Sequence, residues 1–289
     1  MNNALLRDAN RQALSLRRLR GISRDEPANP FDLAASVGVE QKFLNVKTLE
    51  GMFAREPSPC ILLPSTQHRP YGRISFSCAH ELGHFQLGHA TTVDKIGELV
   101  ELNRSDELAA NTFASWLLMP RQAVLVAFEC RSIEPSEANA VELLTIAGEL
   151  GVSLDALTNH MVYSLGMCNQ EWLKRTSKIS VKDICVAAIG ERYSDRTLFI
   201  DEFWRSKTID LEVGDRVVFL SKIRIGGELH CMQLLETPTK AGSTFQIYAP
   251  TTPGSFQLAL NDNPFVLRIS RRHYTGSYKY RYLPDEEGE

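Results

Sequence analysis

The residue pattern with the clearest chemistry is the pentapeptide His80-Glu81-Leu82-Gly83-His84. On a helix, residues four apart project from the same face, so both imidazoles can bind one tetrahedral zinc ion. Glu81 lies one step round the helix, where its carboxylate can accept a proton from a zinc-activated water and pass it to the leaving amine. The pattern therefore predicts a zinc-dependent endopeptidase with His80 and His84 as metal ligands and Glu81 as the catalytic base.

A catalytic zinc site needs a third protein ligand, and the acidic start of the next predicted helix offers two candidates. Ser105 is placed to cap this helix, and Asp106 and Glu107 follow in its first turn. Glu107 is the expected ligand, and Asp106 is the alternative. Acidic residues in a first turn also complement the helix dipole when no metal is present, so both readings stay open at this point.

Two neighbouring helices must carry these ligands. The hydrophobic spacing predicts one over residues 75–87 and another over residues 105–118, ended by Pro120. In and just before the first helix, four apolar side chains can face a core while the histidines face a cleft. The apolar residues are Ile74, Phe76, Leu82 and Leu87.

The remaining elements of the first 165 residues are also mainly helical. Further helices are expected over residues 5–19, 30–38, 135–150 and 154–165, and Ser153 is a plausible N-cap for the last. Three short extended runs, at residues 43–46, 52–54 and 60–63, are separated by glycine and proline. They predict a small antiparallel sheet.

The pattern of hydrophobic and turn-forming residues changes after about Asn169. Runs typical of strands occur at residues 208–213, 216–220, 244–248 and 265–269, with glycine-containing turns between them. The expected fold class is α+β: a mostly helical peptidase domain with a small sheet, then a helical segment, then a β-rich domain. The expected limits are 1–130, 131–168 and 169–289.

Composition is that of an ordinary globular protein, with 43% hydrophobic and 23% charged residues over 289 positions. The formal net charge of -3 gives no global attraction to nucleic acid or to an acidic membrane. Neither a secretory signal nor a run of about 20 apolar residues is evident, so no membrane association is expected. The six cysteines are scattered and form no Cys-x-x-Cys pair, which favours reduced thiols and a cytoplasmic location.

Three segments together resemble the ImmA/IrrE family of metallopeptidases. Residues 73–89, which contain the His-Glu-x-x-His pattern, are similar to the family's signature helix. The pattern Glu107-x-x-Ala110-Asn111-x-Phe113-Ala114, continuing to Pro120, resembles its second motif. Residues 150–157 resemble the segment of helix-turn-helix character that follows, so the resemblance covers about residues 30–166.

The resemblance implies a gluzincin-like fold in which His80, His84 and Glu107 bind zinc, with manganese as the other metal to expect in the cell. It also implies a role in transcription regulation: cleavage of a helix-turn-helix repressor in response to a stress or mobile-element signal. Two departures matter. No repressor domain is recognisable at the N-terminus, so the substrate is expected in trans. The β-rich region matches no family motif, so its signal, a small molecule or a nucleic acid, is unassigned.

Several weaker features allow two interpretations each. His89 is expected to support the site or lie on the surface, and Cys78 to be a buried small side chain rather than a thiolate that blocks the zinc. His160 could stabilise an oxyanion if it faced the cleft. Residues 52–54 or 60–63 could form an edge strand that pairs with an extended substrate, or else ordinary sheet core.

Two further segments invite comparison with nucleic-acid binders. The helix at residues 154–165 carries no lysine or arginine, which favours packing or substrate docking over DNA contact. Residues 271–282 interleave basic and aromatic side chains, a composition that suits stacking on nucleotides. Alternation along a strand, with tyrosines toward the core and charges outward, explains the same pattern and is preferred.

The rival to an enzyme is a metal-stabilised regulatory or DNA-binding protein whose metal site is structural. A structural site needs ligands but no general base. The presence of Glu81 therefore favours the peptidase.

Overall fold

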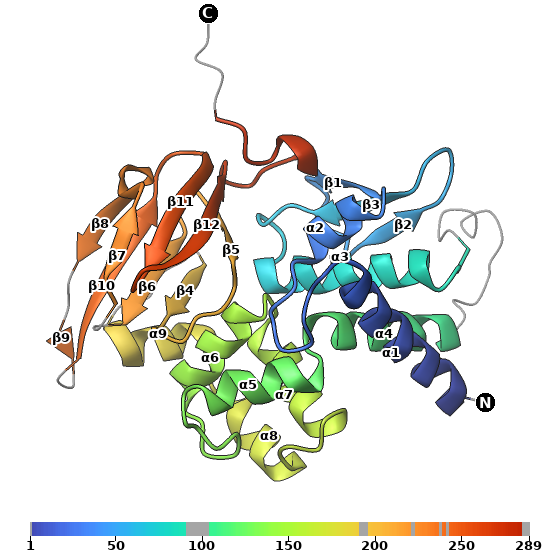
Figure 1. Ribbon diagram of the computed structural model, residues 1–289, viewed down its shortest axis with the longest axis horizontal. Coiled ribbons are helices and arrows are strands. Elements are labelled where there is room, and N and C mark those ends of the chain that lie inside the picture. The colour runs from blue at the N-terminus through green and yellow to red at the C-terminus, as the bar shows by residue number, and fades with distance from the viewer. Residues whose placement is uncertain are drawn as a thin grey trace, which may run out of the picture. The chain divides into compact units, whose positions relative to one another are not determined.

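A computed structural model describes residues 2–90, 104–190, 196–220, 223–236, 239–240 and 243–284. Two compact units emerge. The first comprises Met1–Val126, Leu150–Val152 and Thr275–Tyr278, and the second comprises Ala127–Glu149, Ser153–Tyr274 and Lys279–Glu289. The predicted α+β class is confirmed, with a helical N-terminal part and a β-rich C-terminal region (Figure 1). The division into three domains at residues 130 and 168 stays a prediction.

Helices of the first unit are α1 (Asn2–Leu19), α2 (Pro30–Ser36), α3 (Tyr71–Gln86) and α4 (Arg104–Leu118). Local signals set their starts: the Asn29 side chain accepts hydrogen bonds from two backbone N–H groups of α2, and Pro30 occupies its first turn. Helix α3 begins at Tyr71 rather than near residue 75, because Pro70 supplies the N-cap and Tyr71 packs into the core. None of the helices among the described residues is long and apolar enough to cross a membrane.

The sheet of the first unit has four strands in the order β13-β1-β3-β2. Their bounds are Glu40–Leu44 for β1, Met52–Ala54 for β2, Cys60–Pro64 for β3 and Gly276–Ser277 for β13. Strand β2 pairs with β3 in antiparallel fashion, but β1 and β3 run parallel, so the prediction of an antiparallel sheet is wrong in this respect. Strand β2 lies at an edge and β3 lies inside, which leaves residues 52–54 as the edge-strand candidate.

Helices α3 and α4 pack closely because small residues line their contact (Figure 1). A Cβ atom added to Gly83 would lie 3.3 Å from the backbone of Ala110 and 3.1 Å from the Phe113 ring. Ala109, Ala110 and Ala114 of α4 are fully buried. This close approach allows a side chain of α4 to reach the histidines of α3.

A buried arginine forms a hydrogen bond with the C-terminal end of α4. Arg17 of α1 is fully buried and donates hydrogen bonds to the carbonyl oxygens of Leu117 and Ser23, each at 2.6 Å, and to that of Glu26. Burial lowers the pKa of Arg17 to about 10, so the guanidinium remains charged at neutral pH. Its bond to Leu117 satisfies a carbonyl that would otherwise be left without a partner at the end of a helix.

Five further helices follow along the chain: α5 (Arg121–Glu129), α6 (Ala140–Glu149), α7 (Leu154–Tyr163), α8 (Gln170–Thr176) and α9 (Val181–Ile189). The predicted start of α6 near residue 135 is wrong, because Asn139 caps the helix. The Asn139 side chain accepts hydrogen bonds from two backbone N–H groups, and the Glu142 carboxylate accepts one from the backbone N–H of Asn139. Ser153 caps α7 as predicted, at 3.1 Å from the nitrogen of Ala156. Helices α5, α8 and α9 were not predicted from the sequence.

Two sheets form the β-rich part of the second unit. One has the order β4-β6-β10-β8, with β9 beside β10, and the other has the order β5-β12-β11-β7. The bounds are β4 (Thr197–Ile200), β5 (Thr208–Glu212), β6 (Arg216–Leu220), β7 (Ile225–Gly227), β8 (Met232–Glu236), β9 (Thr239–Lys240), β10 (Ser243–Pro250), β11 (Gly254–Leu260) and β12 (Asn263–Ser270). A short 3-10 helix, Leu229–Cys231, precedes β8.

Successive side chains of β4 point to opposite faces of its sheet and so enter two different cores. Leu198 and Ile200 enter a core formed by both sheets, whereas Phe199 points to the opposite face and packs with Cys185 and Ile189 of α9. The unpredicted helix α9 therefore covers one face of the first sheet.

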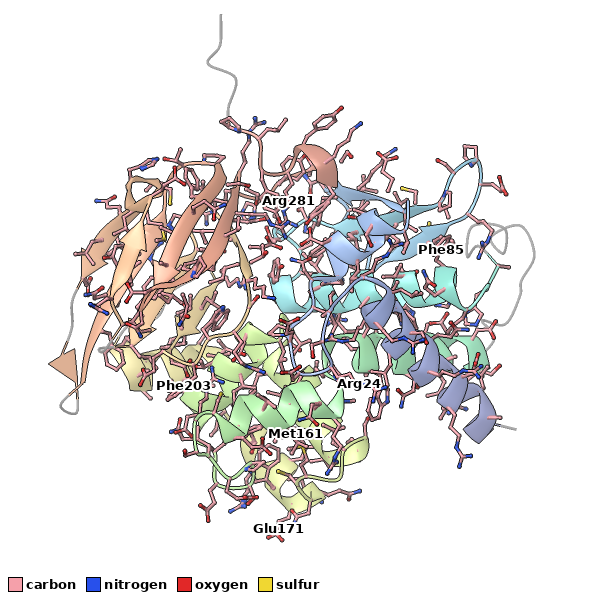
Figure 2. The ribbon with its side chains drawn as sticks, viewed as in Figure 1. Arg24, Phe85, Met161, Glu171, Phe203 and Arg281 are labelled. Atoms are coloured by element: carbon pink, nitrogen blue, oxygen red, sulfur yellow. The ribbon has the colours of Figure 1, made fainter. Side chains whose placement is uncertain are left out.

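The segment after β12 does not follow the predicted strand alternation. Tyr278–Tyr280 forms a 3-10 helix, Tyr280 is exposed, and Arg281, labelled in Figure 2, is almost fully buried. Arg281 lies 3.4 Å from a carboxylate oxygen of Glu212. The expectation of tyrosines inward and charges outward is therefore wrong, because an ion pair holds a charge inside.

Candidate metal centre

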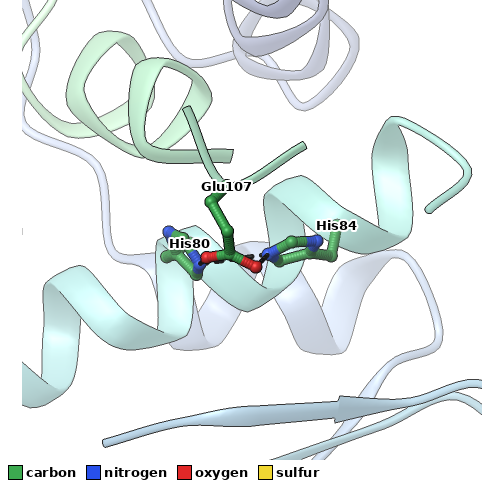
Figure 3. A group of neighbouring side chains, drawn as sticks. All are labelled: His80, His84 and Glu107. Carbon is green, nitrogen blue, oxygen red and sulfur yellow. Dashed lines mark hydrogen bonds and ion pairs between the residues drawn. The ribbon is translucent and has the colours of Figure 1, made fainter. Parts of the chain in front are cut away.

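Three metal-ligand side chains converge between α3 and α4. Glu107, in the first turn of α4, reaches over α3 to the space between His80 and His84 (Figure 3). Its Oε2 lies 3.2 Å from Nε2 of His80, and its Oε1 lies 3.5 Å from Nε2 of His84. The helical spacing of four residues brings both imidazoles to the same face, as the sequence predicted.

The donor set fits a small divalent cation. The ligand atoms of His80, His84 and Glu107 all lie within 4.8 Å of one another, and the two Nε2 atoms are 3.0 Å apart. Two nitrogens bound tetrahedrally to zinc at 2.0–2.1 Å would be separated by about 3.3 Å. A shift of a few tenths of an ångström would therefore suffice to admit the ion.

Hydrogen bonds on the opposite ring nitrogens set the orientation of the imidazoles. Nδ1 of His80 lies 3.1 Å from Oδ1 of Asn111, one turn along α4 from Glu107. If this nitrogen carries the proton and donates to the amide oxygen, Nε2 keeps its lone pair for a metal. Asn111 thus complements Glu107 from the same helix.

Glu81 is buried beside the donor group, with 6% of its surface exposed. Burial is the main cause that raises its pKa, to about 7, and a backbone hydrogen bond from Phe53 acts in the opposite direction. Gly51 is the close neighbour that leaves room for it: a Cβ atom at this position would lie 2.8 Å from Oε1 of Glu81. A carboxylate with this pKa can both take up and release a proton near neutral pH.

The two histidines differ in their electrostatic surroundings. Burial lowers the pKa of His84 to about 4, and the neighbouring His80 acts in the same direction. Burial also lowers the pKa of His80, but its hydrogen bond to Glu107 and the nearby Glu81 carboxylate outweigh that effect and raise it. A bound divalent cation would favour neutral imidazoles at both positions, because metal ligation requires their lone pairs.

Other candidates from the sequence lie outside the donor group. Asp106 points to His89, with 3.8 Å between Oδ1 and Nε2, and His89 contacts His84 rather than joining the three donors. Cys78 is fully buried, as expected for a small packing side chain. His160 is buried on α7 of the second unit and is not a member of the group.

The arrangement and a family comparison together identify the class of protein. Histidines four residues apart on one helix, with a carboxylate from the next, lie in a domain with a zinc-metallopeptidase-like fold. Residues 35–161 match the IrrE N-terminal-like domain, Peptidase M78. The domain at residues 35–161 is therefore of the ImmA/IrrE metallopeptidase type, as the sequence motifs predicted. No match was found among curated proteins.

Sequence reasoning did not single out the roles of Asn111 and Gly51. Asn111 stands four residues after Glu107, and this helical spacing alone was a signal that both face α3. Gly51 carries no comparable signal, because only the folded chain shows which side chain passes over it.

Proposed function

We propose that the protein is a metal-dependent endopeptidase of the gluzincin type, in which His80, His84 and Glu107 bind zinc and Glu81 is the general base. The observation that carries the proposal is the convergence of these three donors beside a buried carboxylate, within an IrrE N-terminal-like domain. A metal site with a purely structural role would have no use for a carboxylate buried next to its ligands.

The roles of the protein groups follow from their positions. A zinc ion held at this site would supply Lewis-acid activation of water and of the scissile carbonyl. Glu81, buried beside the donor group, takes a proton from the attacking water and then gives it to the leaving amine. Asn111 keeps the His80 ring turned so that Nε2 faces the site.

Strand β2 supports binding of an extended peptide. Among the described strands it pairs only with β3, which leaves one edge for another strand. Its Phe53 and the preceding Gly51 border Glu81, so a peptide added to this edge would pass the catalytic base. The proposed substrate is a protein whose cleavage site can become extended.

We take that substrate to be a helix-turn-helix transcriptional repressor, cleaved in trans in the cytoplasm. The match to the IrrE N-terminal-like domain supports this choice. The β-rich region of the second unit is proposed to receive the activating signal, a small molecule or a nucleic acid. The alternative function is a metal-stabilised regulatory protein that acts on the repressor without cleaving it.

The proposal is tested with a helix-turn-helix repressor encoded next to this chain. Co-incubation with zinc or manganese should give two repressor fragments by mass spectrometry, chelation should stop their formation, and added metal should restore it. Relief of repression while the repressor stays intact would contradict the peptidase and favour the regulatory alternative.

Gly51→Ala should slow cleavage roughly 100-fold, the scale expected when a catalytic group is misplaced by about 1 Å. The added methyl group would meet Oε1 of Glu81 at 2.8 Å and displace the carboxylate. Gly51 has an ordinary backbone conformation, so alanine introduces no backbone strain, and zinc affinity should be unchanged. Gly88→Ala is not a suitable control because its φ is positive; Ser36→Ala, outside the site, is suitable. Cleavage at the wild-type rate would contradict the role of Gly51.

A further inference from the structure

The imidazole of His89 lies against His84, on the side away from the other donors. Nδ1 of His89 is 2.9 Å from Nδ1 of His84, and Nε2 of His89 is 3.8 Å from Oδ1 of Asp106. Asp106, His89 and His84 thus form a chain that leads from α4 to the candidate metal site.

The end of α3 fixes His89 in this place. Gly88, with a φ of 73°, turns the chain back, and the N–H of His89 bonds to the carbonyl of His84 at 3.0 Å. The N–H of Gly88 bonds to Phe85, which completes a Schellman cap. Arg55 donates to the carbonyl of His89 at 3.2 Å, and its guanidinium lies over the Phe85 ring.

One arrangement of protons is compatible with both contacts: the 2.9 Å hydrogen bond between the two Nδ1 atoms and the longer, 3.8 Å electrostatic contact of His89 with Asp106. With the Nε2 lone pair of His84 directed to the site, its Nδ1 carries a proton and donates to Nδ1 of His89. The proton of His89 then lies on Nε2, which faces the Asp106 carboxylate. Both rings are neutral in this arrangement, as metal ligation requires.

We infer that His89 is a positioning residue that holds His84 in the metal-binding tautomer and orientation, with Asp106 orienting His89 in turn. The inference rests on the proposed metal site and adds to it the residues that contact the ligand His84 and its neighbour His89. His80 has its counterpart in Asn111, so each ligand histidine is held through its Nδ1 atom. The sequence offered Asp106 as an alternative ligand; the structure gives it this different task.

The test measures metal affinity, and it requires no substrate. His89→Ala should weaken zinc binding roughly 10- to 100-fold in competition with a chelator, the range seen when the hydrogen-bond partner of a ligand histidine is removed. The visible spectrum of the cobalt-substituted protein should change, because the His84 ring loses its fixed orientation. His89→Asn places an amide oxygen near the position of Nδ1 and should recover much of the loss.

A double-mutant cycle distinguishes coupling between Asp106 and His89 from a general loss of stability. Asp106→Asn should weaken binding in the wild-type background but have little effect once His89 is asparagine. His230→Ala, an exposed histidine of the second unit, serves as the matched control and should bind zinc normally. Wild-type affinity and spectrum in His89→Ala would overturn the inference, as would equal losses for Asn and Ala. Absence of zinc binding by the wild type would instead overturn the proposed function.

Discussion

Glu81→Gln is expected to lower the rate of repressor cleavage roughly 100- to 10,000-fold, the usual contribution of a general base. Glutamine has the same shape and fits the space left by Gly51, but it cannot accept a proton from water. Because Glu81 is not one of the three donors, zinc affinity should change little. The initial rate of fragment formation and the zinc dissociation constant are the two quantities to measure.

The control for this substitution is Glu40→Gln, the same chemical change at an exposed position of β1. It should cleave at the wild-type rate. If Glu81→Gln also cleaves within a few-fold of wild type, Glu81 is not the base. If it retains biological activity without cleavage, the regulatory alternative gains support.

Glu107→Gln should lower zinc affinity by more than about 100-fold and abolish cleavage. Zinc binds to sites with four protein ligands with a free energy of roughly 10–16 kcal/mol, so one ligand accounts for about 3 kcal/mol of it. A loss of about 3 kcal/mol corresponds to a decrease in affinity of about 100-fold. The carboxylate of Glu107 lies nearest to both Nε2 atoms, at 3.2 and 3.5 Å, and no other acid joins the group among the described residues. Titration against a chromophoric chelator measures the loss directly.

Asp106→Asn is the matched control, because it makes the same change one residue earlier in α4. Its expected effect is smaller, within about tenfold, since Asp106 acts through His89. A larger loss for Asp106→Asn than for Glu107→Gln would show that the ligand was assigned to the wrong residue. Circular dichroism of both metal-free variants should match that of the wild type.

The metal-site helices could be predicted because the signals that define them are local. Spacing of four residues places His80 and His84 on one face wherever that helix lies, and Glu107 begins the next helix with Ser105 and Asp106. Family motifs then narrowed the choice of ligand. The structure places the two oxygens of Glu107 near both imidazole rings, which no spacing rule could establish.

Strand partners could not be predicted in the same way. The parallel pairing of β1 with β3 depends on contacts between residues far apart in sequence, whereas short runs separated by turns suggest hairpins. Helices α8 and α9 were missed because the strand-like runs beyond residue 208 dominated the interpretation of the whole C-terminal half. Their caps, Asn169 and Ser180, were nevertheless present in the sequence.

The contacts that the site residues make with their neighbours also could not be predicted from the sequence. The support of His84 by His89 requires the turn at Gly88, and the fit of Glu81 requires a glycine at the residue before β2. Such contacts are set by a few tenths of an ångström, which residue types and spacing do not specify.

The pairing of β13 with β1 has a consequence for how the chain acquires its structure during synthesis. Residues 276–277 complete the sheet of the first unit, where the Tyr278 hydroxyl donates to Asp32 at 2.7 Å and its ring stacks on Phe31. A nascent chain therefore carries the metal-site helices long before it carries the strand that covers β1. The sheet of the first unit is finished only after residue 277 has been made, and fragments that end before residue 275 leave that edge of β1 open.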